Sequence, residues 1–147
     1  MPQSRSRRRR QGSNAIEFVL CLPIFIVVLS AVFDFGWLLF QQSSLDAAVN
    51  LGCRAGSLVD PGEVDENVDM VAERAEEETW EALDLMGGGT CSDCDFSAAL
   101  EGDFPTRSLH CEVERSFRPL LGFTFGERRI GSSQATRMEW QYDPTGV

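Results

Sequence analysis

The feature that most constrains this chain is an uncharged apolar run that follows a cluster of arginines. Five arginines lie within residues 5–10, residues 18–33 carry no charge, and the apolar character continues to Phe40. As a helix, residues 18–40 would be about 34 Å long, enough to cross a hydrocarbon core of about 30 Å. A basic flank keeps the N-terminus of such a helix in the cytoplasm. The sequence therefore predicts a single-pass membrane protein whose C-terminal part is exported.

A cleaved secretory signal peptide is the main alternative for this run. A signal peptide needs an apolar stretch of about 7–15 residues and then a cleavage site made of small residues. The run here is longer, and the residues that follow it, "FDFGWLLFQQSS", contain no such site. We therefore favour a membrane helix that is retained.

Two residues are unusual inside a membrane helix. Pro23 lacks a backbone donor, so we expect a kink or a locally melted turn near Leu22. Asp34 is costly within a span unless it is paired or lies near the headgroups. We expect it to be solvated near the outer interface, with Trp37 as an interfacial aromatic residue.

A second acid, Glu17, lies at the start of the apolar run in "RRRRQGSNAIEF". A glycine after a basic leader, with Glu and Phe five and six residues later, resembles the class III signal peptide of the type IV pilin superfamily. The resemblance implies that prepilin peptidase cuts between Gly12 and Ser13, where glycine leaves the backbone unobstructed and extended. Glu17, followed by Phe18, could then neutralise the new α-amine of its own chain or of a neighbour once the helices are bundled.

A narrower resemblance covers about the first third of the chain. The sequence is similar to the N-terminal region of TadE-like proteins, the minor pilins or pseudopilins of the tight adherence (Tad, or Flp) system. The motifs that carry it are Glu17-Phe18, Leu22-Pro23, Asp34-Phe35-Gly36 and Leu51-Gly52-Cys53-Arg54-Ala55-Gly56. Cysteines at positions 21 and 53, and Ser13 after the cut, depart from the family pattern.

The remainder of the chain predicts an α+β head. The spanning helix continues as a stalk over residues 13–58, after a leader of residues 1–12, and the head occupies residues 59–147. Within the head, residues 63–86 have near-helical apolar spacing with acids on the other face, which indicates a second, amphipathic helix. Residues 107–117 alternate, and residues 128–142 do so more weakly, so we expect a small antiparallel sheet of two to four strands.

The cysteines fall into two groups. Cys21 lies in the membrane helix, where we expect a small buried apolar residue. Cys53, Cys91, Cys94 and Cys111 are on the exported side, where disulfides form. We expect Cys91 or Cys94 to pair with Cys111 and Cys53 to pair with the remaining cysteine. A metal or thioredoxin-type reading of "CSDC" is weaker because no second CxxC motif follows and the βαβ context is missing.

No pattern in the sequence predicts catalysis or a cofactor. His110, in an alternating segment, is interpreted as solvent-facing rather than as a base. The acidic stretch "EVDENVD" lacks the glycine and glutamate spacing of a calcium loop, so we expect no dedicated metal site, and weak divalent binding stays open. From residue 41 onward 21 acidic side chains accompany 8 basic ones, which disfavours nucleic acid as a partner.

These observations favour a structural, non-enzymatic minor pilin of a Tad/Flp-type pilus. The resemblance implies that its head is too large for the major subunit, so we expect a role in assembly, in priming or at the tip, where adhesion is one option. Its partners would be prepilin peptidase, other pilin and minor pilin subunits, the Tad inner-membrane assembly platform and membrane lipid. It would begin in the inner membrane, with the C-terminus periplasmic, and end in the fibre at the cell surface. The alternative is an uncleaved single-pass inner-membrane protein with a periplasmic binding or sensing head.

Overall fold

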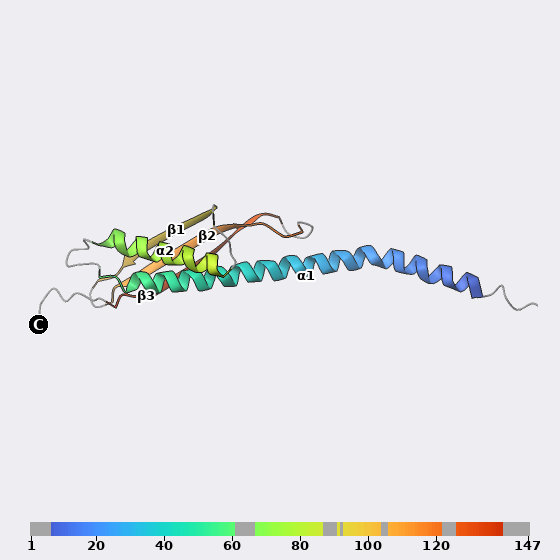
Figure 1. Cartoon of the computed structure of the whole chain (residues 1–147), viewed down its shortest axis with the longest axis horizontal. Coiled ribbons are helices and arrows are strands. Elements are labelled where there is room, and N and C mark those ends of the chain that lie inside the picture. Colours follow the sequence, from blue (N-terminus) through green and yellow to red (C-terminus); the bar gives the residue numbers. More distant parts are fainter. Residues whose placement is uncertain are drawn as a thin grey trace, which may run out of the picture. The chain divides into compact units, whose positions relative to one another are not determined.

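The computed structural model confirms the α+β class. It describes residues 7–60, 67–86, 91, 93–103, 106–121 and 126–139. Two helices are followed by three strands (Figure 1): α1 (Arg7–Ser57), α2 (Val68–Leu85), β1 (Cys94–Glu101), β2 (Ser108–Phe117) and β3 (Arg128–Arg137). The predicted second helix and the strand predicted from residue 107 are thus both present.

The chain divides into two compact units. The helix–loop unit comprises Met1–Trp37 and Pro119–Gly126, and the sheet unit comprises Leu38–Arg118 and Glu127–Val147. Helix α1 contributes to both units, with its residues up to Trp37 in the first and its residues from Leu38 in the second.

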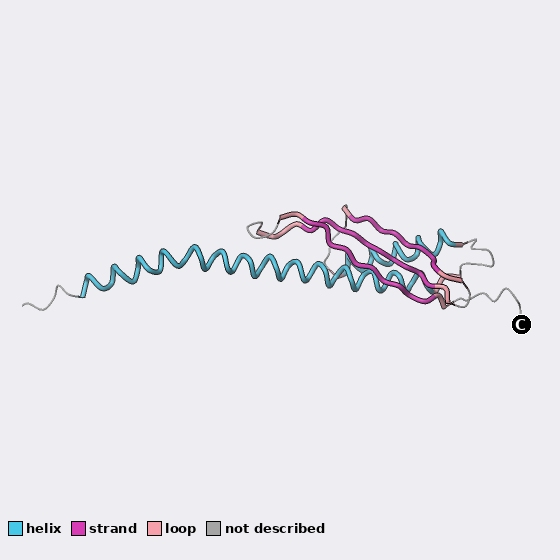
Figure 2. The backbone as a smooth tube through the Cα atoms, turned by 180° about the vertical axis from the view of Figure 1, so that it is seen from behind, coloured by secondary structure: helices cyan, strands magenta, loops and turns pink. Residues whose placement is uncertain are grey.

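The sheet unit is built on an antiparallel sheet of order β1-β2-β3. Helix α2 and the C-terminal part of α1 lie on the same face of this sheet, as the views from both sides show (Figures 1 and 2). Alternate residues of β2 point into the resulting core, where Leu109, Cys111 and Val113 are buried while His110 and Glu112 are exposed. This is the alternation that the sequence predicts for the strand.

The buried core of the sheet unit is supplied by both helices, by β2 and by β3 with the residue after it, while β1 adds half-buried side chains. Its buried apolar residues include Leu45, Ala48, Val49, Val71, Ala75, Ala82, Leu83, Leu109, Val113, Phe117, Ile130 and Met138. At its edge, Trp80 of α2 meets Phe96 of β1 edge-to-face, with ring centroids 6.1 Å apart. Amphipathic α2 buries Val71, Ala75 and Leu83 of the stripe that its sequence spacing predicts and leaves Val68 and Trp80 half-buried, whereas Val64 lies outside the described residues.

Two glycines allow α1 and α2 to approach closely. A Cβ atom on Gly52 would lie 1.9 Å from Thr79 Oγ1 and 2.4 Å from the Ala75 carbonyl oxygen. A Cβ atom on Gly56 would lie 2.8 Å from Ala75 Cβ. These separations are far below van der Waals contact, so neither position accepts a side chain without movement of a helix.

Strand β1 was not expected as a strand in its own right. Its inward-facing residues Phe96, Ala98 and Leu100 alternate with exposed Asp95, Ser97 and Ala99. Alanine, serine and aspartate have low strand propensity, so the segment forms a strand because it pairs with β2 along its whole length.

The disulfides differ from the expected pairing. The structure joins Cys53 to Cys111 and Cys91 to Cys94. Cys53 lies one helical turn from Gly56 on the inner face of α1, so its sulfur meets the central strand. The expected pairing was wrong because it assumed that β1 was a loop free to reach across to Cys111.

Helix α1 continues through Pro23, so the melted-turn alternative does not hold, while its path changes direction in its N-terminal half, which agrees with a kink (Figures 1 and 2). The expectation for the cysteine of this helix is wrong. Cys21 is an exposed free cysteine rather than a buried one.

Candidate functional site

The N-terminal part of α1 exposes apolar side chains almost without interruption. Residues 15–29 are all exposed, and Phe18, Phe25 and Phe33 each have 60–66% of their surface accessible. Soluble proteins rarely leave so large a contiguous apolar surface in water. By length and composition α1 is sufficient to cross a membrane, which suggests that it anchors the chain.

The predicted processing residues lie at the start of this surface. Gly12 and Ser13 fall within α1, whose backbone is helical there rather than extended as expected, and their side chains are outside the description. Glu17 and Phe18 are exposed, and Glu17 makes no ion pair with any residue whose side chain is described. Glu17 is therefore accessible to a partner.

Asp34 has a different environment from the one expected. It is fully buried rather than solvated, and its Oδ1 accepts a hydrogen bond of 2.9 Å from the backbone N–H of Leu121. Leu121 belongs to the connection between β2 and β3, and both residues are in the helix–loop unit. A backbone N–H is a strong partner for a carboxylate, which offsets part of the cost of removing Asp34 from water.

The contact between Asp34 and Leu121 is the feature that sequence reasoning missed. The two residues are 87 positions apart, so no local periodicity connects them. The sequence does contain one indication that this connection contacts another apolar segment. The stretch "RPLLGFTFGE" is unusually apolar for a connection between two strands. An apolar loop of this kind needs an apolar environment, and it shares a compact unit with the apolar part of α1.

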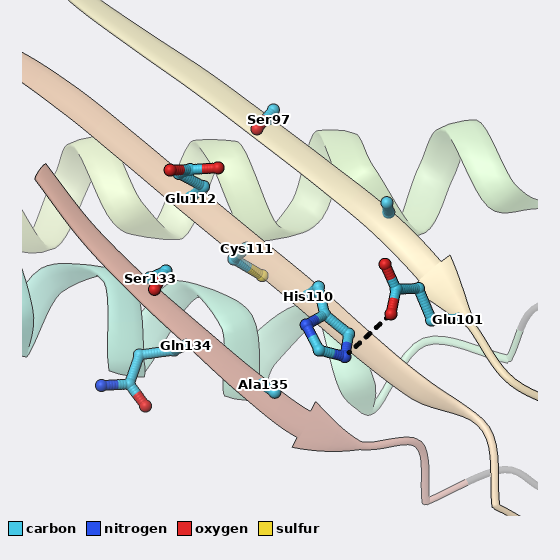
Figure 3. Close-up of a pocket in the computed structure, with 9 residues that line it drawn as sticks. Ser97, Glu101, His110, Cys111, Glu112, Ser133, Gln134 and Ala135 are labelled. Carbon is cyan, nitrogen blue, oxygen red and sulfur yellow. Dashed lines mark ion pairs between the residues drawn. The ribbon is translucent and has the colours of Figure 1, made fainter.

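The face of the sheet opposite the helices carries a hollow of about 470 Å³ lined by side chains of all three strands (Figure 3). His110 and Glu101 point toward each other there, with 3.4 Å between His110 Nε2 and Glu101 Oε2. Both side chains are exposed, so the predicted solvent-facing position of His110 is confirmed and the pair contributes little to stability. Within the described residues no group of three or more His, Cys, Asp or Glu side chains is arranged to hold a metal ion.

The fold and this helix define a class: an α+β protein whose N-terminal helix can anchor it in a membrane. Residues 12–54 match the family model described as TadE-like protein. The matched region contains Glu17, Asp34 and Gly52, so the resemblance seen in the sequence is confirmed for residues 12–54. The match suggests a Tad pilus-associated protein that works with components of that pilus. No curated protein and no solved structure matches the chain.

Proposed function

We propose that the chain is a structural minor pilin of a Tad/Flp-type pilus. Prepilin peptidase removes residues 1–12, and the mature subunit, which begins at Ser13, waits in the inner membrane with its sheet unit in the periplasm. Assembly then transfers the exposed apolar surface of α1 from lipid into a bundle of pilin helices. The subunit has no enzymatic role in this process, and it acts in assembly, in priming or at the tip.

The observation that carries this proposal is the exposed apolar surface of α1 together with the TadE-like match over the same residues. A simple anchor needs only lipid around its helix. A fibre subunit needs a surface that is stable first in lipid and then against other helices, and a continuous apolar face satisfies both environments. Because residues 15–29 present no polar side chain other than Glu17, that face is uninterrupted apart from one carboxylate.

Glu17 supplies the specific interaction in the bundle. A carboxylate buried among helices is strongly destabilising without a partner, and the α-amine created at Ser13 is a partner of opposite charge. The amine belongs to the same chain or to a neighbouring subunit. Phe18, which follows Glu17, adds to the apolar surface beside this pair.

The first test is the intact mass and the N-terminal residue of the protein in native membranes, with and without prepilin peptidase. We expect a chain that begins at Ser13 only when the peptidase is present. Since the backbone at Gly12 is helical, cleavage also requires this end of α1 to unwind in the enzyme. A chain that keeps its arginines under both conditions would instead indicate an uncleaved membrane protein with a binding or sensing head.

The second test separates a fibre subunit from an anchored protein. Glu17→Gln removes the charge but keeps the size of the side chain, so we expect normal membrane insertion and loss of incorporation into sheared fibres. Glu81→Gln is the matched control because Glu81 is an exposed acid on α2. Equal amounts of both variants in fibres would show that the proposed pairing with the amine is wrong.

A further inference from the structure

The connection between β2 and β3 exposes large apolar side chains. Leu120 has 61% of its surface accessible and Leu121 has 42%. They follow Pro119, and the sequence continues with two phenylalanines within the next four residues. Turns between strands are normally polar, so an apolar one indicates a surface that contacts something other than water.

This connection belongs to the same compact unit as the N-terminal part of α1, whereas the strands that flank it belong to the sheet unit. Pro119–Gly126 share a compact unit with α1 up to Trp37. The hydrogen bond from Leu121 N–H to Asp34 Oδ1 joins the two segments on the C-terminal side of the continuously exposed residues 15–29. The position of Leu120 and Leu121 along α1 is therefore set by Asp34.

The length of the helix places Asp34 relative to a bilayer. A hydrocarbon core of about 30 Å corresponds to about 20 helical residues. If Glu17 marks one boundary of the core, the other boundary lies near Trp37, and Asp34 lies about 5 Å inside it at about 1.5 Å per residue. Interfacial protein segments bury their apolar side chains at a similar depth, about 5–10 Å into the boundary between headgroups and acyl chains.

We infer that Pro119–Leu121 is a second membrane contact, in which Leu120 and Leu121 enter the lipid interface at the end of the spanning helix and Asp34 holds them there. The occupant is lipid because any bilayer that covers the exposed Phe33 and Phe35 also reaches residues fastened to Asp34. The contact rests on the part of the proposed function that inserts α1 in a bilayer. It also gives buried Asp34 a role in that function, because Asp34 positions the connection at Pro119–Leu121.

The test measures depth in vesicles of phosphatidylethanolamine and phosphatidylglycerol that contain the full chain. A single cysteine carries an environment-sensitive fluorophore in a Cys21→Ala background, because Cys21 is the free, exposed thiol. Three positions are compared: Leu120→Cys, Ile26→Cys in the middle of the predicted span, and Leu85→Cys, which is 80% exposed on α2. Quenchers attached to lipid headgroups or to acyl chains, and a water-soluble quencher, report the depth of each label.

We expect the label at 120 to be quenched most by the headgroup-proximal quencher, the label at 26 by the acyl-chain quencher, and the label at 85 by the water-soluble one. A label at 120 that behaves like the label at 85, while the label at 26 stays in lipid, would overturn the inference and leave membrane anchoring intact. A label at 26 that is also in water would overturn the anchoring itself. Shielding at 120 that lipid quenchers do not report, and that falls when the ratio of protein to lipid is lowered, would indicate a second copy as the occupant and overturn the lipid contact.

Two substitutions test the role of Asp34. Asp34→Asn keeps an oxygen that accepts from Leu121 N–H, whereas Asp34→Ala removes it. We expect the label at 120 to stay in the interface in the first variant and to become accessible to the water-soluble quencher in the second. The Cys53–Cys111 disulfide, followed by non-reducing electrophoresis, shows whether each variant has folded. An unchanged depth in a correctly folded Asp34→Ala variant would show that Asp34 does not hold the loop.

Discussion

The two ends of α1 have nearly opposite surroundings although they belong to one helix. Residues 15–29 are all exposed and almost all apolar, whereas residues 38–57 bury Leu45, Ala48 and Val49 in the core of the sheet unit. The first segment therefore needs an apolar solvent, and its side chains can differ in shape as long as they remain apolar. The second segment needs neighbours of fixed shape, because a protein interior is close-packed.

The distribution of polar residues along α1 reflects the same difference. Ser44 and Ser57 in the second segment donate to backbone carbonyl oxygens of their own helix, and Gln42 donates to the Gly131 carbonyl oxygen of β3. Directly after the first segment, the buried Ser30 hydroxyl donates to the Ile26 carbonyl oxygen. A helix can thus carry hydroxyl groups in both environments if the backbone accepts their protons.

The largest expected effect concerns the Cys53–Cys111 link, which ties the second segment to the sheet. Its loss through Cys53→Ala and Cys111→Ala together reopens a loop closed over 58 positions, with an expected cost of about 4 kcal/mol. The matched variant, Cys91→Ala with Cys94→Ala, opens a separation of only 3 positions and should cost about 1.5 kcal/mol. Urea unfolding of the full chain in detergent, followed by circular dichroism, gives both values. Equal losses would mean that chain entropy is not the source of the stabilisation.

The second prediction tests the first segment by adding a charge. Ile26→Arg places a guanidinium near the centre of the span, where insertion is opposed by about 3 kcal/mol. Leu85→Arg is the control, because Leu85 is apolar and exposed but lies on α2. We expect the first variant to lose membrane association in alkaline extraction and the second to retain it. Retention of both variants would contradict the assignment of residues 15–29 to lipid.

The third prediction compares two glycines of α1. Gly52→Ala forces a Cβ atom against Thr79 and the Ala75 carbonyl oxygen, and overpacking of this kind costs about 1–3 kcal/mol. Gly36→Ala is the control, since nothing lies within 4 Å of its added Cβ atom. We expect the urea midpoint to fall only for Gly52→Ala. If Gly36→Ala lowers the midpoint equally, the effect arises in the helix itself and not in the contact between α1 and α2.

The local elements of this fold could be predicted from the sequence because each has a repeating pattern. The uncharged run predicts a spanning helix, and alternation at Leu109, Cys111 and Val113 predicts the central strand. Apolar spacing at Val71, Ala75 and Leu83 likewise predicts α2. In each case the period of the side chains, about 3.6 or 2 residues, is a property of a single element.

The features that could not be predicted all depend on a distant partner. In the sequence Asp34 is an acid within an apolar run, and its burial involves the backbone N–H of Leu121, 87 positions away. Gly52 and Gly56 are visible in the family motif, yet their close contact with α2 requires Ala75 and Thr79 on another helix. Strand β1 likewise follows from its pairing with β2, and the Cys53–Cys111 link follows from the contact of α1 with β2.

The smallest expected effect gives the most discriminating test of the difference between the two segments of α1. The two substitutions change the shape of a side chain and leave its polarity unchanged. Val49→Leu adds a methylene group in the core, where Val49 has no exposed surface, and should cost about 1 kcal/mol. Val27→Leu adds the same group to an exposed position in the first segment, where lipid chains rearrange around it, and should leave the urea midpoint and membrane association unchanged. Both variants keep the helix and its hydrophobicity, so helix propensity cannot explain a difference between them. A lowered urea midpoint for Val27→Leu would mean that the first segment also fits a neighbour of fixed shape, and that α1 has one kind of environment along its whole length.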